Sequence, residues 1–173
     1  TADGKRMYFD RNDYFKGKYK KSEEGISQIN LFTAVKENGV WKDIQPVSFN
    51  NSEHSFGQPA LSPDGNTLYF VSDMPGGKGM SDIYKVAVNK DGSLGKPENL
   101  GDNINTEGKE VFPFVDSSGT LYFSSDGHMG LGELDVFYAE ANGSSFGGVR
   151  NIGTDVNSPS DDFAFKYDPK TKE

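Results

Sequence analysis

The chain has 173 residues with 18 basic and 26 acidic side chains, a formal net charge of −8, and no cysteine. Its length fits one ordinary domain of about 100–200 residues, and its 13% aromatic content favours a folded core over a disordered chain. No run approaches the roughly 18 apolar residues of a membrane-spanning helix, and the negative charge argues against nucleic-acid binding. The lack of cysteine excludes disulfide scaffolds and zinc-thiolate sites, and it fits a cytosol and a bacterial periplasm equally well.

An internal repeat of about 50 residues is the main signal in the sequence. A glycine turn followed by an alternating aromatic strand occurs three times: DGKRMYF at 3–9, DGNTLYF at 64–70 and SGTLYF at 118–123. A second strand follows each of them: INLFTAV at 29–35, DIYKVAV at 82–88 and DVFYAE at 135–140. Helical apolar periodicity is almost absent, because glycine and proline interrupt the chain too often.

Further elements complete each repeat. A third element closes each unit, around Pro46 to Phe49, at PENLG 97–101 and at VRNIG 149–153. A short opening strand also precedes the second and third glycine turns, at 58–65 and 112–119. Four short strands per repeat are typical of propeller blades. We therefore predict an all-β fold, a β-propeller of four-stranded antiparallel blades. The expected units are 1–56, 57–110 and 111–161, with a further blade starting at 162–173, where Phe163-Ala164-Phe165 lies.

Two segments carry a family resemblance. SPDGNTLYFVSD at 62–73, followed by GGKGMSDIYKV at 76–86, resembles the WD-like propeller repeat of the TolB type. The longer run at 100–140 resembles the propeller segment of large OmpA-family lipoproteins of the Bacteroidetes envelope, one group of which serves type IX secretion and gliding. The resemblance implies a periplasmic, outer-membrane-associated protein that contacts other envelope proteins. It also implies peptidoglycan binding through an OmpA-like domain, which nothing in this chain matches.

The repeat count predicts an incomplete ring. Three blades are fewer than the roughly 4–8 of a closed propeller, and the first unit starts at its turn, Thr1-Ala2-Asp3-Gly4, without a preceding innermost strand. We expect a fragment of a larger propeller that lies beside further propeller sequence or self-associates through its open edges. Pairing of two three-blade chains into a six-bladed ring is the alternative that the sequence favours less.

Recurring aspartates fit structural roles better than chemical ones. Asp64 and Gly65 suit a tight turn, in which glycine tolerates positive φ. Asp82 and Asp135 open the third strand, and Asp73 and Asp126 end the second, so we expect their carboxylates to accept backbone N–H groups. A calcium ion between Asp73 and Asp82 is the alternative, although no DxDxDG run is present.

Catalytic and cofactor motifs are not found. Ser62, Asp64 and Gly65 approach a sialidase-type Asp box, but the glycine directly follows the aspartate and no tryptophan ends the motif. His54 and His128 have no zinc-ligand spacing, no GxSxG elbow exists, and the glycines at 76–79 are not followed by a predicted helix. We therefore predict a chain that is not an enzyme and that carries no catalytic residue, cofactor or metal.

Long loops are the best candidates for recognition. With strands named a to d from the axis outward, the b–c loops (10–28, 73–81 and 126–134) and the d–a loops (50–57, 101–111 and 153–161) share one face. Loops on a rigid scaffold commonly bind partners. The candidate contact residues are Tyr14, Phe15, Lys16, Lys18, Tyr19, Lys20, Lys21, Met74, Lys78, Met80, His128 and Met129.

These loops lead to one hypothesis and two alternatives. The basic and aromatic first loop suits an acidic protein patch or a glycan strand. The leading hypothesis is a non-catalytic interaction or scaffold module of an envelope protein. The alternatives are a carbohydrate-binding propeller and a propeller glycosidase or peptidase accessory domain, because a fold does not by itself specify function.

Overall fold

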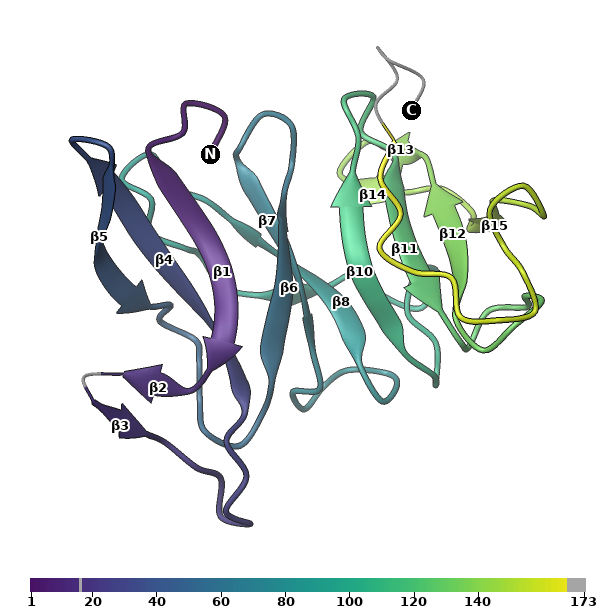
Figure 1. The fold of residues 1–173 in the computed structure, drawn as a ribbon. Coiled ribbons are helices and arrows are strands. Elements are labelled where there is room, and N and C mark those ends of the chain that lie inside the picture. Colours follow the sequence, from purple (N-terminus) through teal and green to yellow (C-terminus); the bar gives the residue numbers. More distant parts are fainter. Residues whose placement is uncertain (16, 168–173) are drawn as a thin grey trace.

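The computed structural model describes residues 1–15 and 17–167, and all of its named strand pairs are antiparallel. Three sheets follow one another along the chain, and we call them blades 1, 2 and 3 (Figure 1). Blade 1 contains β1 (Arg6–Asn12), β4 (Ile29–Glu37) and β5 (Val40–Pro46). Blade 2 contains β6 (Phe56–Leu61), β7 (Thr67–Ser72), β8 (Asp82–Ala87) and β9 (Glu98–Asn99). Blade 3 contains β10 (Glu110–Val115), β11 (Leu121–Ser125), β12 (Asp135–Ala139) and β15 (Arg150–Asn151).

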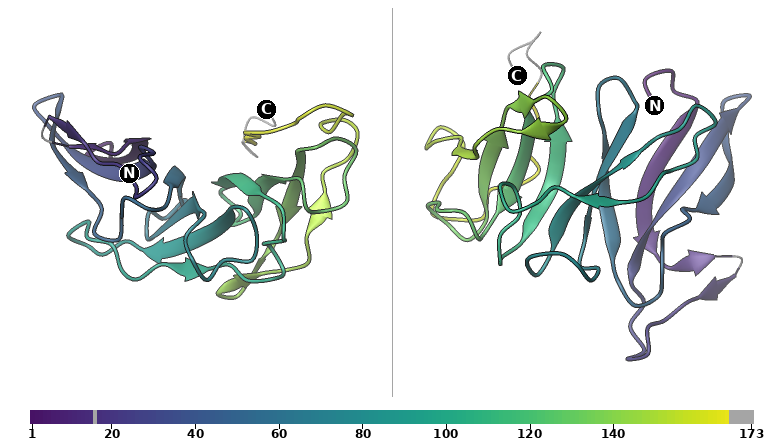
Figure 2. Two further views of the ribbon diagram at one scale, coloured as in Figure 1. Left: turned by 90° about the horizontal axis from the view of Figure 1, so that it is seen from below. Right: turned by 180° about the vertical axis from the view of Figure 1, so that it is seen from behind.

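The three blades stand side by side along a curved arc (Figure 2). In blades 2 and 3 the strands are adjacent in chain order, from β6 and β10 on the inner side of the arc to β9 and β15 on the outer side. Blade 1 has three strands among the described residues, and β1 is at its inner edge. The predicted all-β propeller fold with four-stranded antiparallel blades is confirmed.

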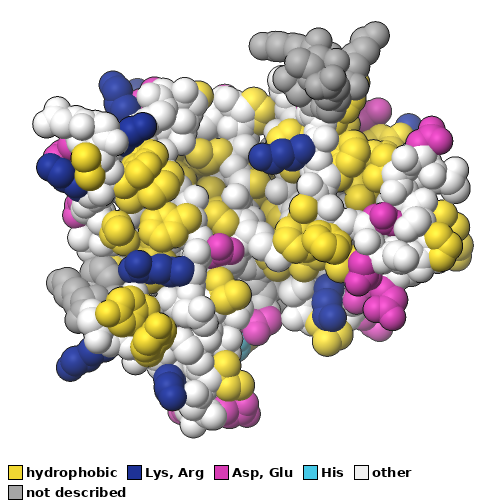
Figure 3. Space-filling model, in the orientation of Figure 1, with side chains coloured by type: hydrophobic (Ala, Val, Ile, Leu, Met, Phe, Trp, Pro, Cys, Tyr) yellow, Lys and Arg dark blue, Asp and Glu magenta, His cyan; other side chains and the backbone are white. Residues whose placement is uncertain are grey.

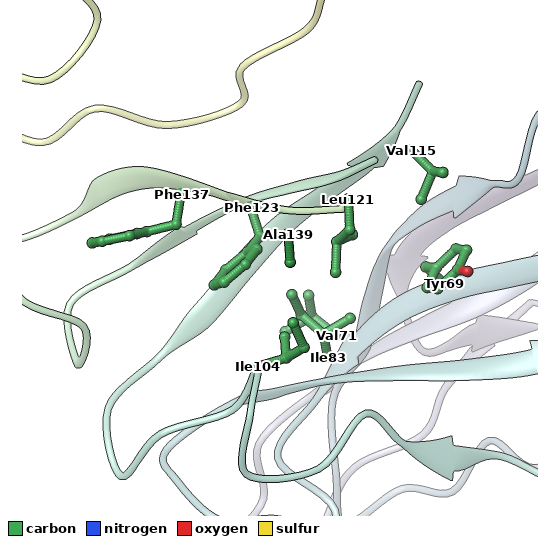
Figure 4. Packing of buried hydrophobic residues seen from close by; sticks show 9 residues of the cluster. All are labelled: Tyr69, Val71, Ile83, Ile104, Val115, Leu121, Phe123, Phe137 and Ala139. Atoms are coloured by element: carbon green, nitrogen blue, oxygen red, sulfur yellow. The ribbon is translucent and has the colours of Figure 1, made fainter. Parts of the chain in front are cut away.

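Apolar side chains between neighbouring blades form the core. Leu31, Phe56 and Phe70 belong to a cluster that packs blade 1 against blade 2. A second cluster joins blades 2 and 3, where Ile83 of β8 meets Phe123 of β11 (Figure 4). Central strands such as β7, whose Leu68 to Ser72 are all buried, carry bulk on both faces because each face contacts another element.

Asparagine side chains attach the loop before each innermost strand to the middle of the neighbouring blade. Asn105 donates from Nδ2 to the carbonyl of Ile83 (3.0 Å) and accepts from the Ile83 N–H (2.8 Å). The same two bonds join Asn50 to Leu31 and Asn157 to Val136. Because Asn105 and Asn157 are buried, these bonds replace hydrogen bonds that water cannot supply there.

Some elements differ from those predicted. The third element of the first unit begins earlier than predicted, because Asn38 (φ 50°) and Gly39 (φ 81°) form a two-residue hairpin turn directly after β4, and β5 covers residues 40–46. Its end coincides with the start of the predicted segment, where the Val47 N–H donates to the Leu31 carbonyl as the Leu100 N–H donates to that of Ile83. Two small hairpins were not predicted: β2 (Tyr14–Phe15) with β3 (Lys18–Tyr19), and β13 (Ala141–Asn142) with β14 (Ser145–Phe146). Within the described residues there is no helix long and apolar enough to cross a membrane.

Buried tyrosines predict a loss of stability at alkaline pH. Burial raises the pKa of Tyr8, Tyr69 and Tyr84 above the ordinary value of 10.0. The folded chain therefore resists ionisation at a pH where the unfolded chain already ionises, and its free energy of unfolding falls as the pH rises above about 10. Urea unfolding at about pH 8 and about pH 11, followed with tyrosinate absorbance, checks this expectation. A Tyr69→Phe, Tyr84→Phe variant should show a smaller decrease, and an equal decrease would contradict the assignment to these side chains.

Candidate functional site

The b–c and d–a loops lie along one edge of all three blades, which is the lower edge in Figure 1 and is called the loop face below. The arrangement follows from strand order. Each second strand runs toward this edge and each innermost strand leaves it, so loops of three blades meet on one side. Such a surface is the usual place for recognition on a rigid β scaffold.

A small hairpin projects from the loop face of blade 1 (Figure 1). We call residues 13–21 the basic hairpin. Tyr14 pairs with Tyr19 across β2 and β3, and their ring centroids are 4.7 Å apart. The buried Asp13 anchors its base, since its N–H donates to the Gln28 carbonyl (2.7 Å) and its carbonyl accepts from the Lys20 N–H (2.8 Å).

The basic hairpin exposes its cations and aromatic rings. Lys18, Lys20 and Lys21 are exposed, and no ion pair links them to any described residue. Tyr14 and Tyr19 are 38% and 64% exposed. Lys16 and the side chain of Phe15 lie outside the described part. Figure 3 shows basic side chains gathered over blade 1 and acidic ones over blade 3.

The candidate residues of blades 2 and 3 fall into two groups. Met80 (65% exposed) and Met129 (94% exposed) project into solvent. Met74 packs against the core cluster between blades 1 and 2, and the Lys78 ammonium lies 3.7 Å from the Asp102 carboxylate. His128 is half-buried.

The surroundings of His128 explain its burial. Its ring stands 5.2 Å from that of Phe137 and 5.8 Å from that of Phe123, and its Nε2 is 2.8 Å from the Ile104 carbonyl oxygen. The structure therefore brings the basic hairpin together as one surface but does not add the histidine to it.

A cavity of about 240 Å³ opens between blades 1 and 2 beside Met80. Ile29, Ser55 and Asp73 line it together with Asp10 at the end of β1. Its mixture of apolar and acidic groups could hold a small polar or apolar side chain of a partner.

The recurring aspartates hold the loops. Asp64 accepts hydrogen bonds from Ser62 Oγ (2.6 Å) and the Asn66 N–H (3.1 Å), and these bonds lower the pKa of its carboxyl. Gly65 follows with φ +72°, the left-handed conformation that a glycine tolerates in a tight turn. The third turn uses Asp116 rather than Ser118, because Asp116 accepts from the N–H groups of Ser118 (2.8 Å) and Thr120 (3.0 Å).

Asp82 and Asp135 hold glycine loops at the start of the third strand. Asp82 accepts from the N–H groups of Lys78 and Gly79 (3.0 Å to Gly79), and Asp135 accepts from Leu131 and Gly132 (2.8 Å each). Asp73 and Asp126 follow the second strand of blades 2 and 3. Each accepts a hydrogen bond from the residue just before the innermost strand of its blade, the Ser55 N–H (2.8 Å) and the Lys109 N–H (2.6 Å).

The acidic side chains and histidines are dispersed over the described residues. These residues contain no group of three or more His, Asp or Glu side chains that could hold a metal ion. His54 Nδ1 is 3.7 Å from Asp73 Oδ1, and both side chains are partly exposed.

Sequence reasoning missed the asparagine bonds described above. Asn50, Asn105 and Asn157 recur at spacings of 55 and 52 residues, so an alignment of the three repeats extended through the d–a loops would have found them. It also missed that blade 1 has more basic residues than blade 3. Residues 1–55 contain nine basic and eight acidic side chains, whereas residues 111–161 contain one basic and seven acidic.

Solved structures share this architecture. Putative TolB from Agrobacterium tumefaciens is similar with a TM-score of 0.55 and 22% identity, over 87% of this chain and 46% of the TolB chain. A puromycin hydrolase is similar with a TM-score of 0.55 and 16% identity, over 86% of this chain and 22% of the hydrolase. No family model matches the chain, and no curated protein matches it.

The blades define a β-propeller fold, and the solved structures that share it include a TolB protein. The chain spans about half the length of the TolB protein that it resembles. At these identities the likeness establishes the fold alone.

Proposed function

We propose that this chain is a non-catalytic interaction module of a cell-envelope protein, and that its loop face binds an acidic surface of another envelope protein. The observation that carries the proposal is the basic hairpin, which presents Lys18, Lys20 and Lys21 unpaired beside the exposed Tyr14 and Tyr19. Lysines close to rigid aromatic rings combine electrostatic steering with a desolvated anchor.

Charge distribution supports an acidic partner. The chain as a whole carries −8, yet the hairpin segment from Lys16 to Lys21 holds four lysines and no acidic residue. The acidic remainder of the surface repels an acidic partner, whereas the basic hairpin attracts it. The partner therefore approaches in one orientation, with the hairpin in front.

The compartment belongs to the same proposal. The run at 100–140 resembles the propeller segment of Bacteroidetes OmpA-family envelope lipoproteins, and the TolB-type fold is consistent with such a module. We place the chain in the periplasm, associated with the outer membrane and with secretion or gliding machinery of the type IX kind. Contact with peptidoglycan would be made through domains outside this chain.

Charge reversal of the basic hairpin should weaken partner binding strongly. In a Lys18→Glu, Lys20→Glu, Lys21→Glu variant we expect affinity for the captured envelope partner to fall by roughly 100-fold or more, because three attractive contacts become repulsive. The partner is first isolated from solubilised envelope on the immobilised wild-type chain and identified by mass spectrometry. Its affinity for each variant is then measured by biolayer interferometry at low and high salt.

A matched control uses exposed lysines on the opposite edge of the blades. A Lys90→Glu, Lys96→Glu variant adds negative charge without touching the loop face and should bind as the wild type does. Equal loss in both variants would show general repulsion and contradict the hairpin as the binding surface.

A carbohydrate-binding propeller is the second candidate, and the exposed Tyr14 and Tyr19 pair favours it. Sugar rings stack on exposed aromatic faces, so Tyr19→Ala would then lower the retention of peptidoglycan fragments while the lysine variant retains them. Release of cleaved fragments during this assay would instead support the glycosidase or peptidase accessory reading.

A further inference from the structure

The cavity between blades 1 and 2 has both apolar and acidic walls. It holds about 240 Å³, which is less than the roughly 300–1,000 Å³ of pockets for drug-sized ligands and suits a single side chain. Ile29 and Met80 line it and are 44% and 65% exposed, so they form an apolar rim on the loop face. Asp10 and Asp73 line it as well. A side chain that enters from solvent therefore meets apolar surface and carboxylates together.

Asp10 occupies a position that belongs to the core in the next blade. It opposes Leu31 across β1 and β4, as Val71 opposes Ile83 across β7 and β8. Leu31 and Ile83 correspond, because each forms the same pair of hydrogen bonds with an asparagine of a d–a loop. Val71 packs between blades 2 and 3 although β6 pairs with β7. The orientation of Asp10 toward blade 2 therefore does not depend on what lies at the inner edge of β1.

Gly57 leaves room for the Asp10 carboxylate. It precedes the bulge residue Gln58 in β6, as Val111 precedes Phe112 in β10. Val111 packs against the core cluster between blades 2 and 3, whereas a Cβ at Gly57 would lie 2.9 Å from Asp10 Oδ2. An aspartate and a glycine thus stand where two valines close the corresponding place in the next interface. The cavity results from these two exchanges.

Oxygen atoms around the cavity have acceptor capacity to spare. Asp10 Oδ2 accepts from the Gln58 N–H (2.6 Å) and Asp73 Oδ1 from the Ser55 N–H (2.8 Å). Within the described residues the second oxygen of each carboxylate accepts no hydrogen bond. Ser81 also lines the cavity, and its Oγ is buried without a partner among these residues. Since buried polar atoms normally have a partner, this oxygen and the two carboxylates indicate that a donor belongs in the cavity.

Positive charge is scarce at this place. Asp10 forms no ion pair with any cationic side chain of the described residues, and Asp73 lies 3.7 Å from the partly exposed His54 Nδ1. A cation that enters from outside would meet two carboxylates where part of the surrounding water is excluded. Attraction between charges is stronger there than in bulk water.

We propose that this cavity binds a lysine side chain of the envelope protein that contacts the basic hairpin, a partner that rests on the proposed function. The methylene groups of the lysine pack along Ile29 and Met80, and its ammonium donates to Asp10 and Asp73. Lysine fits better than arginine, because one oxygen of each carboxylate already bonds to the backbone. A single free oxygen suits a point charge, whereas a guanidinium favours both oxygens of one carboxylate.

A lysine analogue tests the cavity without any partner. N-acetyl-lysine-N′-methylamide, titrated into the isotope-labelled chain, should shift the amide NMR resonances of Gly57, Gln58 and Ser81 with a dissociation constant in the millimolar range. The norleucine analogue has the same aliphatic stem without the ammonium and should bind at least roughly 10-fold more weakly. Equal binding of the two analogues, or tighter binding of the arginine analogue, would overturn the proposal.

Neutralising Asp10 should weaken binding of the lysine analogue by roughly 10-fold. In Asp10→Asn the amide oxygen still accepts from the Gln58 N–H, so the variant removes the charge and keeps that bond. Asp102→Asn removes the same charge from an 85% exposed side chain outside the cavity and should bind as the wild type does. The charge-reversed hairpin variant should also bind the analogue normally at about 0.15 M salt. Failure of the hairpin and failure of the cavity are therefore told apart.

Refilling the cavity keeps the proposal testable if the asparagine variant does not fold. Asp10→Val, Gly57→Val reproduces the valine pair between blades 2 and 3, and it should unfold cooperatively in urea and bind no analogue. Binding retained by this variant would contradict the cavity as the site. In the partner assay, Asp10→Asn should lower the affinity by roughly 10-fold. An unchanged partner affinity in a variant that has lost the analogue would overturn the assignment of the lysine to that partner.

Discussion

Phe70→Ala should cost about 3–5 kcal/mol of the free energy of unfolding, the range for truncating a fully buried aromatic side chain. Phe70 is fully buried at the centre of the cluster that joins blades 1 and 2. Its ring centroid lies 5.2 Å from that of Phe49 and 5.7 Å from that of Tyr84, so removal leaves a cavity with aromatic walls. Urea unfolding followed by tryptophan fluorescence measures the decrease in the free energy of unfolding. Trp41 lies in blade 1, so its fluorescence reports the separation of blade 1 from blade 2.

An exposed aromatic residue serves as the control. Tyr19 is 64% exposed on the basic hairpin, and Tyr19→Ala should change the free energy of unfolding by less than about 0.5 kcal/mol. Both variants are compared at one protein concentration, since association would stabilise the folded state by mass action. If Phe70→Ala cost no more than the control, blades 1 and 2 would not share a cooperative core.

Asn105→Leu should destabilise the chain by about 1–3 kcal/mol, because it leaves the buried Ile83 N–H without a partner, while the Ile83 carbonyl keeps its bond from the Leu100 N–H (3.1 Å). Asn105 is fully buried and bonds both the N–H and the carbonyl of Ile83, and it also donates to Asn99 Oδ1 (2.9 Å). Leucine has the same number and branching of side-chain heavy atoms as asparagine but bulkier methyl groups, so an overpacking cost adds to that of the lost hydrogen bonds. The same urea titration measures it.

The exposed Asn89 provides the comparison for this second variant. Asn89→Leu removes a bond to Ser93 Oγ (3.0 Å) in a solvated turn, where water replaces the lost partner. We expect a change within about 0.5 kcal/mol. Equal effects at the two positions would show that the recurring asparagine is not a structural attachment of the loop.

The amino-acid pattern was enough to predict the strands that are buried on both faces. The segments at 64–70 and 118–123 alternate bulky side chains after a turn, and they became β7 and β11 within a few residues of the expected bounds. Such strands are determined locally, because β-branched and aromatic residues favour extended backbone and the glycine turn sets where each strand starts. The outer strand of blade 1 begins earlier than predicted, because the Asn38-Gly39 turn was not read as a hairpin signal.

The candidate site was predictable in composition and less so in arrangement. The lysines and tyrosines of the first loop stand out in the sequence, yet their pairing across β2 and β3 depends on Asp13 bonding to Gln28, fifteen residues away. His128 and Met74 look like loop residues in the sequence, but tertiary packing places both against the core. Burial of a loop side chain depends on which blade lies beside it, which no local pattern records.

By itself, the sequence determined that this chain forms propeller blades, because repeat spacing, turn residues and strand alternation are all local properties. Only the tertiary structure showed that Asp10 accepts a bond from the Gln58 N–H beside a cavity, that Ser81 buries an unpartnered Oγ, and that the asparagines bind the middle strands. Each of these depends on hydrogen bonds between residues at least nineteen positions apart or on their absence. Such bonds form only when the blades pack side by side, and that packing also decides which cavities remain between them.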